Sequence, residues 1–190
     1  FGEGSYTGKG IYDIDAFEAA LSGRIPENTL LSHDLFEGVF ARAGLASDIE
    51  LVEDFPSRYD VAGKRQHRWT RGDWQLLPWL FLRPSNRHAL PIIGQWKMLD
   101  NLRRSLLAPL TFMALVLCWA MPLRAGVAAT LLLLAAMAIP VFLASLFSVL
   151  PHRAGIRIDH HLRMLGAELK HSAAQAFFAV AFLADQAWRM

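Results

Sequence analysis

Two short segments hold the side chains whose types and spacing could do chemistry. Residues 32–38 read Ser-His-Asp-Leu-Phe-Glu-Gly and place a carboxylate, Asp34, beside His33. Residues 65–75 read Arg-Gln-His-Arg-Trp-Thr-Arg-Gly-Asp-Trp-Gln and alternate cationic with aromatic side chains. A carboxylate can take the proton of an attacking hydroxyl, while arginine binds diphosphates and tryptophan packs on sugar rings. Together the segments predict transfer of a sugar to an alcohol.

Asp34 is the candidate general base, because glycosyl transfer needs a carboxylate within reach of the acceptor hydroxyl. Asp is also a preferred N-cap, so Asp34 could equally begin the helix expected over residues 35–43, which Gly44 should end. The two roles are compatible, because a capping position fixes the carboxylate at the edge of a cavity. Glu37 could complete a capping box.

The second candidate group lies on a helix expected over residues 66–82, with a break near Pro78. Its arginines recur every third residue and so form one row on that helix. The members of the group are Arg65, Arg68, Arg71, Trp69 and Trp74. Guanidinium groups bind phosphate oxygens in pairs and keep their charge. The alternative is a basic helix that lies against anionic lipid headgroups.

Asp13 and Asp15 form an Asp-x-Asp pattern, which can hold a divalent cation. We expect no metal site here, because Asp15 with Glu18 has the spacing of a capping box that begins a helix ending near Leu21. Alternation over residues 49–54 predicts a strand, and residues 56–63 a loop.

Two long apolar runs follow the polar part of the chain. Residues 106–123 hold 18 uncharged residues and residues 125–150 hold 26, with Arg124 between them. Each run can cross a hydrocarbon core of about 30 Å. A buried helix pair in a soluble protein is the alternative. Cys118 lies within the first run and is expected to serve packing.

Basic residues lie outside the two runs and predict that both ends of this hairpin are cytoplasmic. They are Lys97, Arg103 and Arg104 before the first run, and Arg153, Arg157 and Arg163 after the second. The stripe formed by Ile158, Leu162, Leu165 and Leu169 predicts an amphipathic helix on the membrane surface. A net charge of +2 gives no indication of nucleic-acid binding. The chain begins with Phe1, and we expect a piece of a longer protein.

Four segments in the same order resemble the glycosyltransferase region of cyclic β-1,2-glucan synthases: residues 4–17, 31–38, 67–75 and 99–105. The chain is similar, more loosely, to processive synthases of the cellulose and chitin type. Their Thr-Glu-Asp triplet aligns with residues 32–34, which implies that Asp34 is the base.

The Gln-x-x-Arg-Trp motif of those synthases aligns with residues 65–69, with Arg65 where glutamine is expected. Arg68 and Trp69 therefore carry over most directly. The full set implied to bind acceptor or donor is His33, Arg65, Gln66, Arg68, Trp69, Arg71, Asp73 and Trp74.

The resemblance implies UDP-glucose as donor and a growing β-1,2-glucan as acceptor, with inversion and later ring closure. It also implies Mg²⁺ or Mn²⁺ held elsewhere in the same polypeptide, and a bacterial inner-membrane location. Residues 1–104 would be the C-terminal part of a cytoplasmic GT-A-type α/β domain. Residues 105–150 would be two transmembrane helices, and residues 151–190 an interfacial helix leading to another membrane segment. This piece alone would be inactive. A synthase of a different β-linked polymer and a non-catalytic membrane module are the alternatives.

Overall fold

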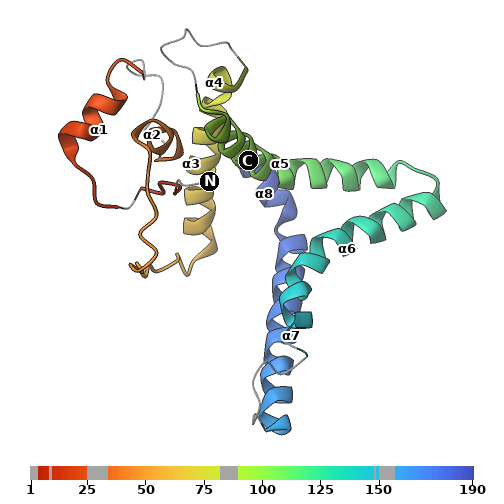
Figure 1. Cartoon of the computed structure of the whole chain (residues 1–190). Helices are drawn as coiled ribbons and strands as arrows, with labels where there is room; N and C mark the ends of the chain where they lie inside the picture. The colour runs from red at the N-terminus through yellow and green to blue at the C-terminus, as the bar shows by residue number, and fades with distance from the viewer. Residues whose placement is uncertain (1–3, 9, 25–33, 82–89, 148, 150–156) are drawn as a thin grey trace. The chain divides into compact units, whose positions relative to one another are not determined.

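The computed structural model describes residues 4–8, 10–24, 34–81, 90–147, 149 and 157–190, and all of their regular structure is helical (Figure 1). The helices are α1 Ile14–Leu21, α2 Asp34–Ala41, α3 Tyr59–Gln75, α4 Leu77–Phe81, α5 Ile92–Trp119, α6 Leu123–Phe147, α7 Ile158–Ala181 and α8 Leu183–Arg189. The chain forms two compact units. One comprises residues 1–106 with 189–190, and the other comprises residues 107–188.

The strand predicted over residues 49–54 is wrong. This segment is irregular, and its apolar side chains are solvated, with Leu51 67% and Val52 95% exposed. A strand is stabilised by its ladder to a neighbouring strand, and the described part of the chain contains no strand with which this segment could pair. The α/β part of the expected fold class is therefore not observed in these residues.

Helix α1 starts with a different capping residue from the one predicted, and helix α2 ends earlier than predicted. Asp13, and not Asp15, is the N-cap of α1, and its Oδ1 accepts a hydrogen bond of 2.9 Å from the Ala16 amide. Helix α2 ends at Ala41, before Gly44, because Arg42 adopts a left-handed φ of 59°. The Arg42 amide then donates to the Gly38 carbonyl at 2.9 Å, which satisfies one of the last carbonyls of the helix.

Helix α3 begins at Tyr59, seven residues before the predicted start, so residues 59–63 are helical and the predicted loop is shorter. Gly63 lies inside the helix and is buried. The predicted break near Pro78 is confirmed. The chain leaves α3 at Leu76 and starts α4 at Leu77, so that Pro78 stands in the first turn of a new helix, where its missing N–H costs no hydrogen bond.

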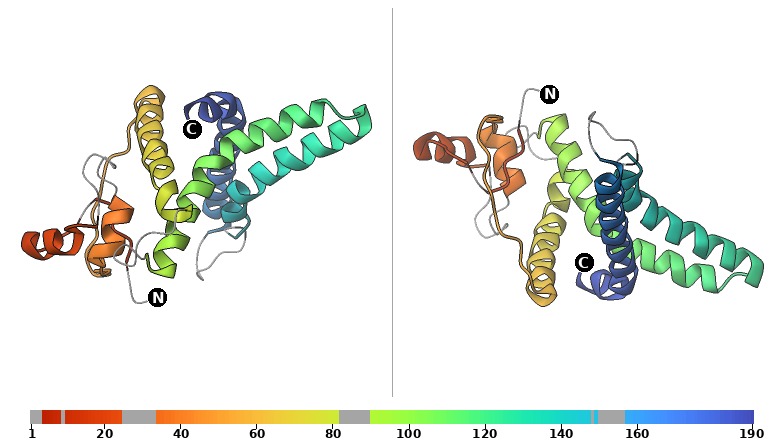
Figure 2. Two further views of the ribbon diagram at one scale, coloured as in Figure 1. Left: turned by 90° about the horizontal axis from the view of Figure 1, so that it is seen from above. Right: turned by 90° about the horizontal axis from the view of Figure 1, so that it is seen from below.

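The core of the first unit joins α2 to the α3–α4 junction and to the start of α5. Its buried members are Phe36, Val39, Phe40, Leu76, Leu90 and Met98. Phe36 packs edge-on against Trp79 at 5.1 Å between ring centroids. A Cβ on Gly94 of α5 would lie 2.6 Å from Val39 Cγ1, so the glycine allows α5 to approach α2 closely. Figure 2 shows α1 beside α2 from above and from below.

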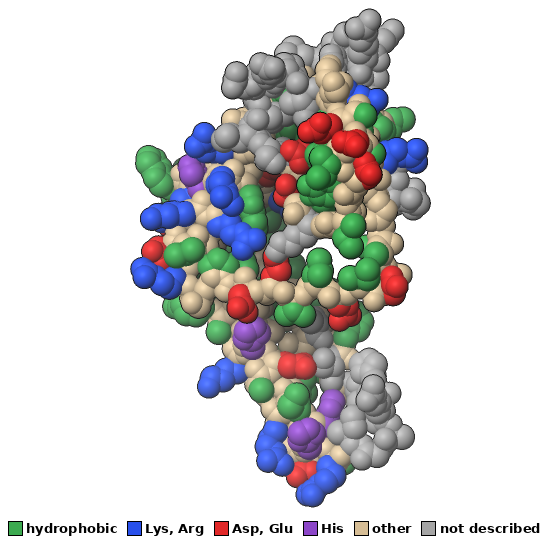
Figure 3. Space-filling model, turned by 90° about the vertical axis from the view of Figure 1, so that its left-hand side faces the viewer, with side chains coloured by type: hydrophobic (Ala, Val, Ile, Leu, Met, Phe, Trp, Pro, Cys, Tyr) green, Lys and Arg blue, Asp and Glu red, His purple; other side chains and the backbone are tan. Residues whose placement is uncertain are grey.

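In the second unit, α6 packs along α7 (Figure 1). Ser145 and Ser172, both buried, share a hydrogen bond of 3.0 Å between the two helices. The turn before α6 is tight, because a Cβ on Gly126 would lie 2.5 Å from the Cys118 carbonyl oxygen. At the start of α7, Asp159 accepts from Arg157 and Arg163, and Figure 3 shows basic, acidic and histidine side chains together at this lower end.

Within the described residues, two helices are long and apolar enough to cross a membrane, as the sequence predicted. The candidate spans are Ile92–Trp119 and Leu123–Leu143. Only 6% of the most apolar window of the second span is buried within the protein, which is unlike the core helix of a soluble domain. Pro109 and Pro140 lie inside these helices, as membrane helices tolerate. The surface location predicted for residues 151–190 stays a prediction.

Candidate functional site

Asp34 is the first residue of α2, and the segment of residues 4–8 runs antiparallel along that helix. The Gly4 amide donates to the Ala43 carbonyl at 2.7 Å. A Cβ on Gly38, near the middle of α2, would lie 2.5 Å from Tyr6 Cβ. Gly8 has a φ of +83°, and a Cβ there would lie 2.7 Å from Asp34 Oδ2. The backbone at Gly8 therefore lies directly against the carboxylate of the candidate base.

Tyr6 completes the surroundings of this carboxylate. Burial raises the pKa of the Tyr6 phenol, and Tyr12 and the negative charges of Asp34 and Glu37 raise it further. The neutral phenol is thereby stabilised beside the carboxylate. Tyr12 packs on Phe17 at 4.7 Å between centroids, and Tyr6 contacts Tyr12 edge-on at 6.2 Å. The Tyr6 ring thus feels the charge of Asp34 and packs in a small aromatic cluster, which the sequence did not predict.

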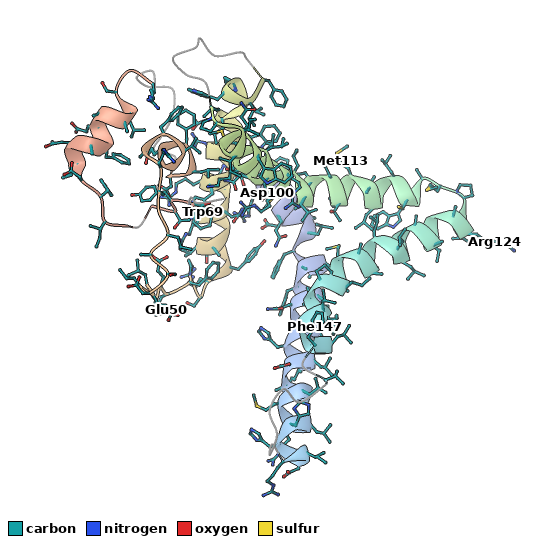
Figure 4. All side chains as sticks on the ribbon, viewed as in Figure 1. Glu50, Trp69, Asp100, Met113, Arg124 and Phe147 are labelled. Carbon is teal, nitrogen blue, oxygen red and sulfur yellow. The ribbon has the colours of Figure 1, made fainter. Side chains whose placement is uncertain are left out.

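The cationic and aromatic group lies on one rigid helix, α3. The Arg65 guanidinium stacks on the Trp69 ring at 4.5 Å from its centroid, which is a cation–π contact. Arg68 and Arg71 are exposed, and Trp69, labelled in Figure 4, is 44% exposed. Gln66 is half-buried. Helical geometry therefore leaves two guanidinium groups and one indole accessible to a ligand.

Two other members of the predicted set, Trp74 and Asp73, make contacts within the protein, as does the neighbouring His67. The His67 and Trp74 side chains, which stand two helical turns apart, contact the backbone carbonyls of Arg189 and Met190. His67 Nδ1 lies 2.5 Å from the Arg189 oxygen, and Trp74 Nε1 donates to the Met190 oxygen at 3.3 Å. Asp73 accepts from Asn101 Nδ2 at 3.2 Å and from Ser105 Oγ at 2.7 Å.

The core brings the end of α3 to α2, since Leu76 and Phe36 belong to the same buried cluster. No hydrogen bond or ion pair within the described ranges joins Asp34 to Arg65, Arg68 or Arg71. His33 lies outside the described residues. The structure therefore holds Asp34 and the arginine row in one unit, as separate groups.

The described residues contain no group of three or more His, Cys, Asp and Glu side chains that could hold a metal ion. The carboxylate of Asp13 caps α1, and Asp15 is exposed in the first turn of that helix.

Two sets of contacts were not predicted from the sequence. Gly8 lies against Asp34 and Gly38 lies against Tyr6, and the two glycines were the signal for these contacts, since close backbone contact favours glycine. Asn101 and Ser105 contact Asp73, and their spacing of four residues on α5 indicated a shared face.

The geometry describes a polar unit that presents a carboxylate and a cationic helix, followed by apolar helices of membrane length. No family model matches the chain. Over all 190 residues the chain is similar to a glucan synthase, as its sequence segments predicted. It is 46% identical to "Cyclic beta-(1,2)-glucan synthase NdvB" of Rhizobium meliloti (strain 1021), and it spans 7% of the length of that relative.

Proposed function

We propose that this chain is part of a membrane-embedded inverting glycosyltransferase that transfers glucose from UDP-glucose to a growing β-1,2-glucan. The observation that carries the proposal is 46% identity, over the whole chain, to a protein named for cyclic β-(1,2)-glucan synthesis. The two apolar helices support attachment to a membrane. The product is closed into a ring by other parts of the same polypeptide.

The reaction proposed is a single displacement at the donor sugar. Asp34 takes the proton of the 2-hydroxyl of the glucan end, whose oxygen attacks C1 of glucose as the bond to UDP breaks. Arg68 stabilises the negative charge that develops on UDP, because a guanidinium binds phosphate oxygens in pairs. Trp69 contacts the acceptor ring. A Mg²⁺ or Mn²⁺ ion would be held by ligands that lie outside this chain.

The larger architecture is part of the same proposal. Residues 1–104 belong to the C-terminal part of a cytoplasmic GT-A-type α/β domain whose strands lie outside this chain. The apolar helices cross the bacterial inner membrane as a hairpin with both ends cytoplasmic, in agreement with the basic residues that flank it. Residues 151–190 lie at the interface and lead to a further membrane segment.

The test is a chimaera in which this chain replaces the aligned 190 residues of the Rhizobium meliloti relative. Membranes are supplied with radiolabelled UDP-glucose, and the linkage of the product is determined. Asp34→Asn should lower synthesis by about 100-fold or more, which is the usual range for loss of a general base, and should leave UDP-glucose binding unchanged. Asp54→Asn, an exposed carboxylate on the irregular segment, is the matched control and should be active.

Two results would contradict the proposal. Polymer synthesis by Asp34→Asn at the wild-type rate would remove Asp34 from the role of base. A well-expressed chimaera that incorporates no glucose, beside an active parent synthase, would remove the assignment of this segment to β-1,2-glucan synthesis.

A further inference from the structure

Asp73 lies at the centre of a hydrogen-bonded network that joins α3 to α5. Each of its two carboxylate oxygens accepts one bond from α5, Oδ1 from Asn101 and Oδ2 from Ser105. Ser105 is 2% exposed. The Arg104 guanidinium donates to Asn101 Oδ1, so the amide of Asn101 has a fixed orientation with its nitrogen toward Asp73. Hydrogen bonds to a charged acceptor in a buried place are stronger than neutral ones.

This network determines which side of α3 faces away from α5. Successive residues of an α-helix are separated by about 100°, so Arg68, five residues before Asp73, lies about 140° around the axis. Trp69, four residues before it, lies about 40° away. Fixing Asp73 on α5 therefore turns Arg68 outward, in agreement with its exposure. The apolar contacts of Leu76 position the end of the helix, while the hydrogen bonds fix its rotation.

The network also lies at the point where α5 changes from charged to uncharged residues. Asp100 forms ion pairs with Arg103 and Arg104 on the same turns of α5. The long uncharged run starts at Leu106, immediately after Ser105. Asp73 thus attaches α3, which bears the arginines, to the charged part of α5 just before its uncharged run.

We propose that Asp73 is a positioning residue: through Asn101 and Ser105 it fixes the rotation of α3 on α5, and so presents Arg68 to the diphosphate of the donor. This inference rests on the proposed function for the identity of the ligand. It assigns to Asp73 a contact inside the protein in place of the ligand contact that the resemblance implied.

The test uses the same chimaera and three variants. Asp73→Asn keeps the shape but removes the charge and one acceptor. The double variant Asp73→Asn with Asn101→Asp, called the exchange variant, restores the pairing. Its carboxylate on α5 can accept from the new amide on α3 and from Arg104, and the oxygen of that amide can still accept from Ser105. Thr70→Val is the matched control. Thr70 is 1% exposed on the same helix, and its hydroxyl has no hydrogen-bond partner among the described residues.

We expect Asp73→Asn to raise the KM for UDP-glucose and to lower kcat/KM by about tenfold or more, since displacements near 1 Å can cost that much. A merely smaller folded fraction would lower the apparent kcat and leave KM unchanged. The exchange variant should recover most of kcat/KM, and Thr70→Val should match wild type.

Hydrogen exchange over residues 59–75, followed by mass spectrometry, gives a second measurement that needs no activity. Exchange should be faster in Asp73→Asn and return to the wild-type rate in the exchange variant. Unchanged exchange in Asp73→Asn, or an unchanged KM in an active variant, would overturn the inference. An inactive wild-type chimaera with normal hydrogen-exchange results would instead count against the proposed function and leave the α3–α5 attachment supported.

Discussion

Replacing Gly8 by alanine should displace the candidate base. Two costs follow from the structure. Gly8 has a φ of +83°, which for an alanine costs about 1–2 kcal/mol. Its new Cβ would also lie 2.7 Å from Asp34 Oδ2, and ordinary contact begins at 3.4 Å, so the oxygen must retreat by about 0.7 Å. A shift of that size in a reacting group can reduce the rate by roughly 10- to 100-fold.

Gly23→Ala provides the matched control for this prediction. Gly23 also has a left-handed φ, +70°, but nothing lies within 4 Å of the position of its Cβ. Both variants therefore carry the backbone cost, and only Gly8→Ala adds the clash with Asp34. Glucan synthesis by the chimaera, normalised to folded protein, should fall for Gly8→Ala and stay within about twofold of wild type for Gly23→Ala. Equal activity of the two variants would refute the reasoning that the Gly8 backbone positions Asp34.

Two further predictions concern stability. Asp13→Ala should cost about 1 kcal/mol by removing the N-cap of α1, whereas Asp15→Ala should cost less; thermal unfolding of the two variants checks the order, and the reverse order would contradict the capping assignment. In the second unit, Ser145→Ala and Ser172→Ala should show a coupling of about 1 kcal/mol in a double-mutant cycle, the usual net contribution of a hydrogen bond; zero coupling would show that the pair contributes no net stability.

The sequence predicted best those features that local chemistry decides. The apolar runs became helices, as their length and their high content of leucine and alanine predict. The break at Pro78 followed from the missing N–H of proline. Asp15 was predicted to be the N-cap in place of Asp13, because Asp15 has the capping-box spacing to Glu18. The structure decided between two neighbouring carboxylates that differ little in capping preference.

Features that depend on distant parts of the chain were predicted less well. The alternation of residues 49–54 resembles a strand, but strand formation requires a partner that no local pattern supplies. Residues 56–63 were predicted to be a loop, yet α3 passes through Gly63, and the Arg189 side chain covers this glycine, with carbon and nitrogen atoms 3.4 Å from the position of a Cβ. The candidate site shows the same division. The residue types of Asp34, Arg68 and Trp69 could be recognised from motifs, while the contacts of Gly8 with Asp34 and of Asn101 with Asp73 could not.

The contacts between α3 and residues 189–190 also constrain the order in which the protein can be made. His67 reaches the Arg189 carbonyl across 122 residues of sequence. During synthesis, α3 leaves the ribosome long before this carbonyl exists, and both apolar helices are made in between. The Gly63–Trp74 face of α3 therefore lacks these contacts until α5 to α8 have all been synthesised. These contacts of α3 therefore form last, and a premature stop before residue 189 would remove them.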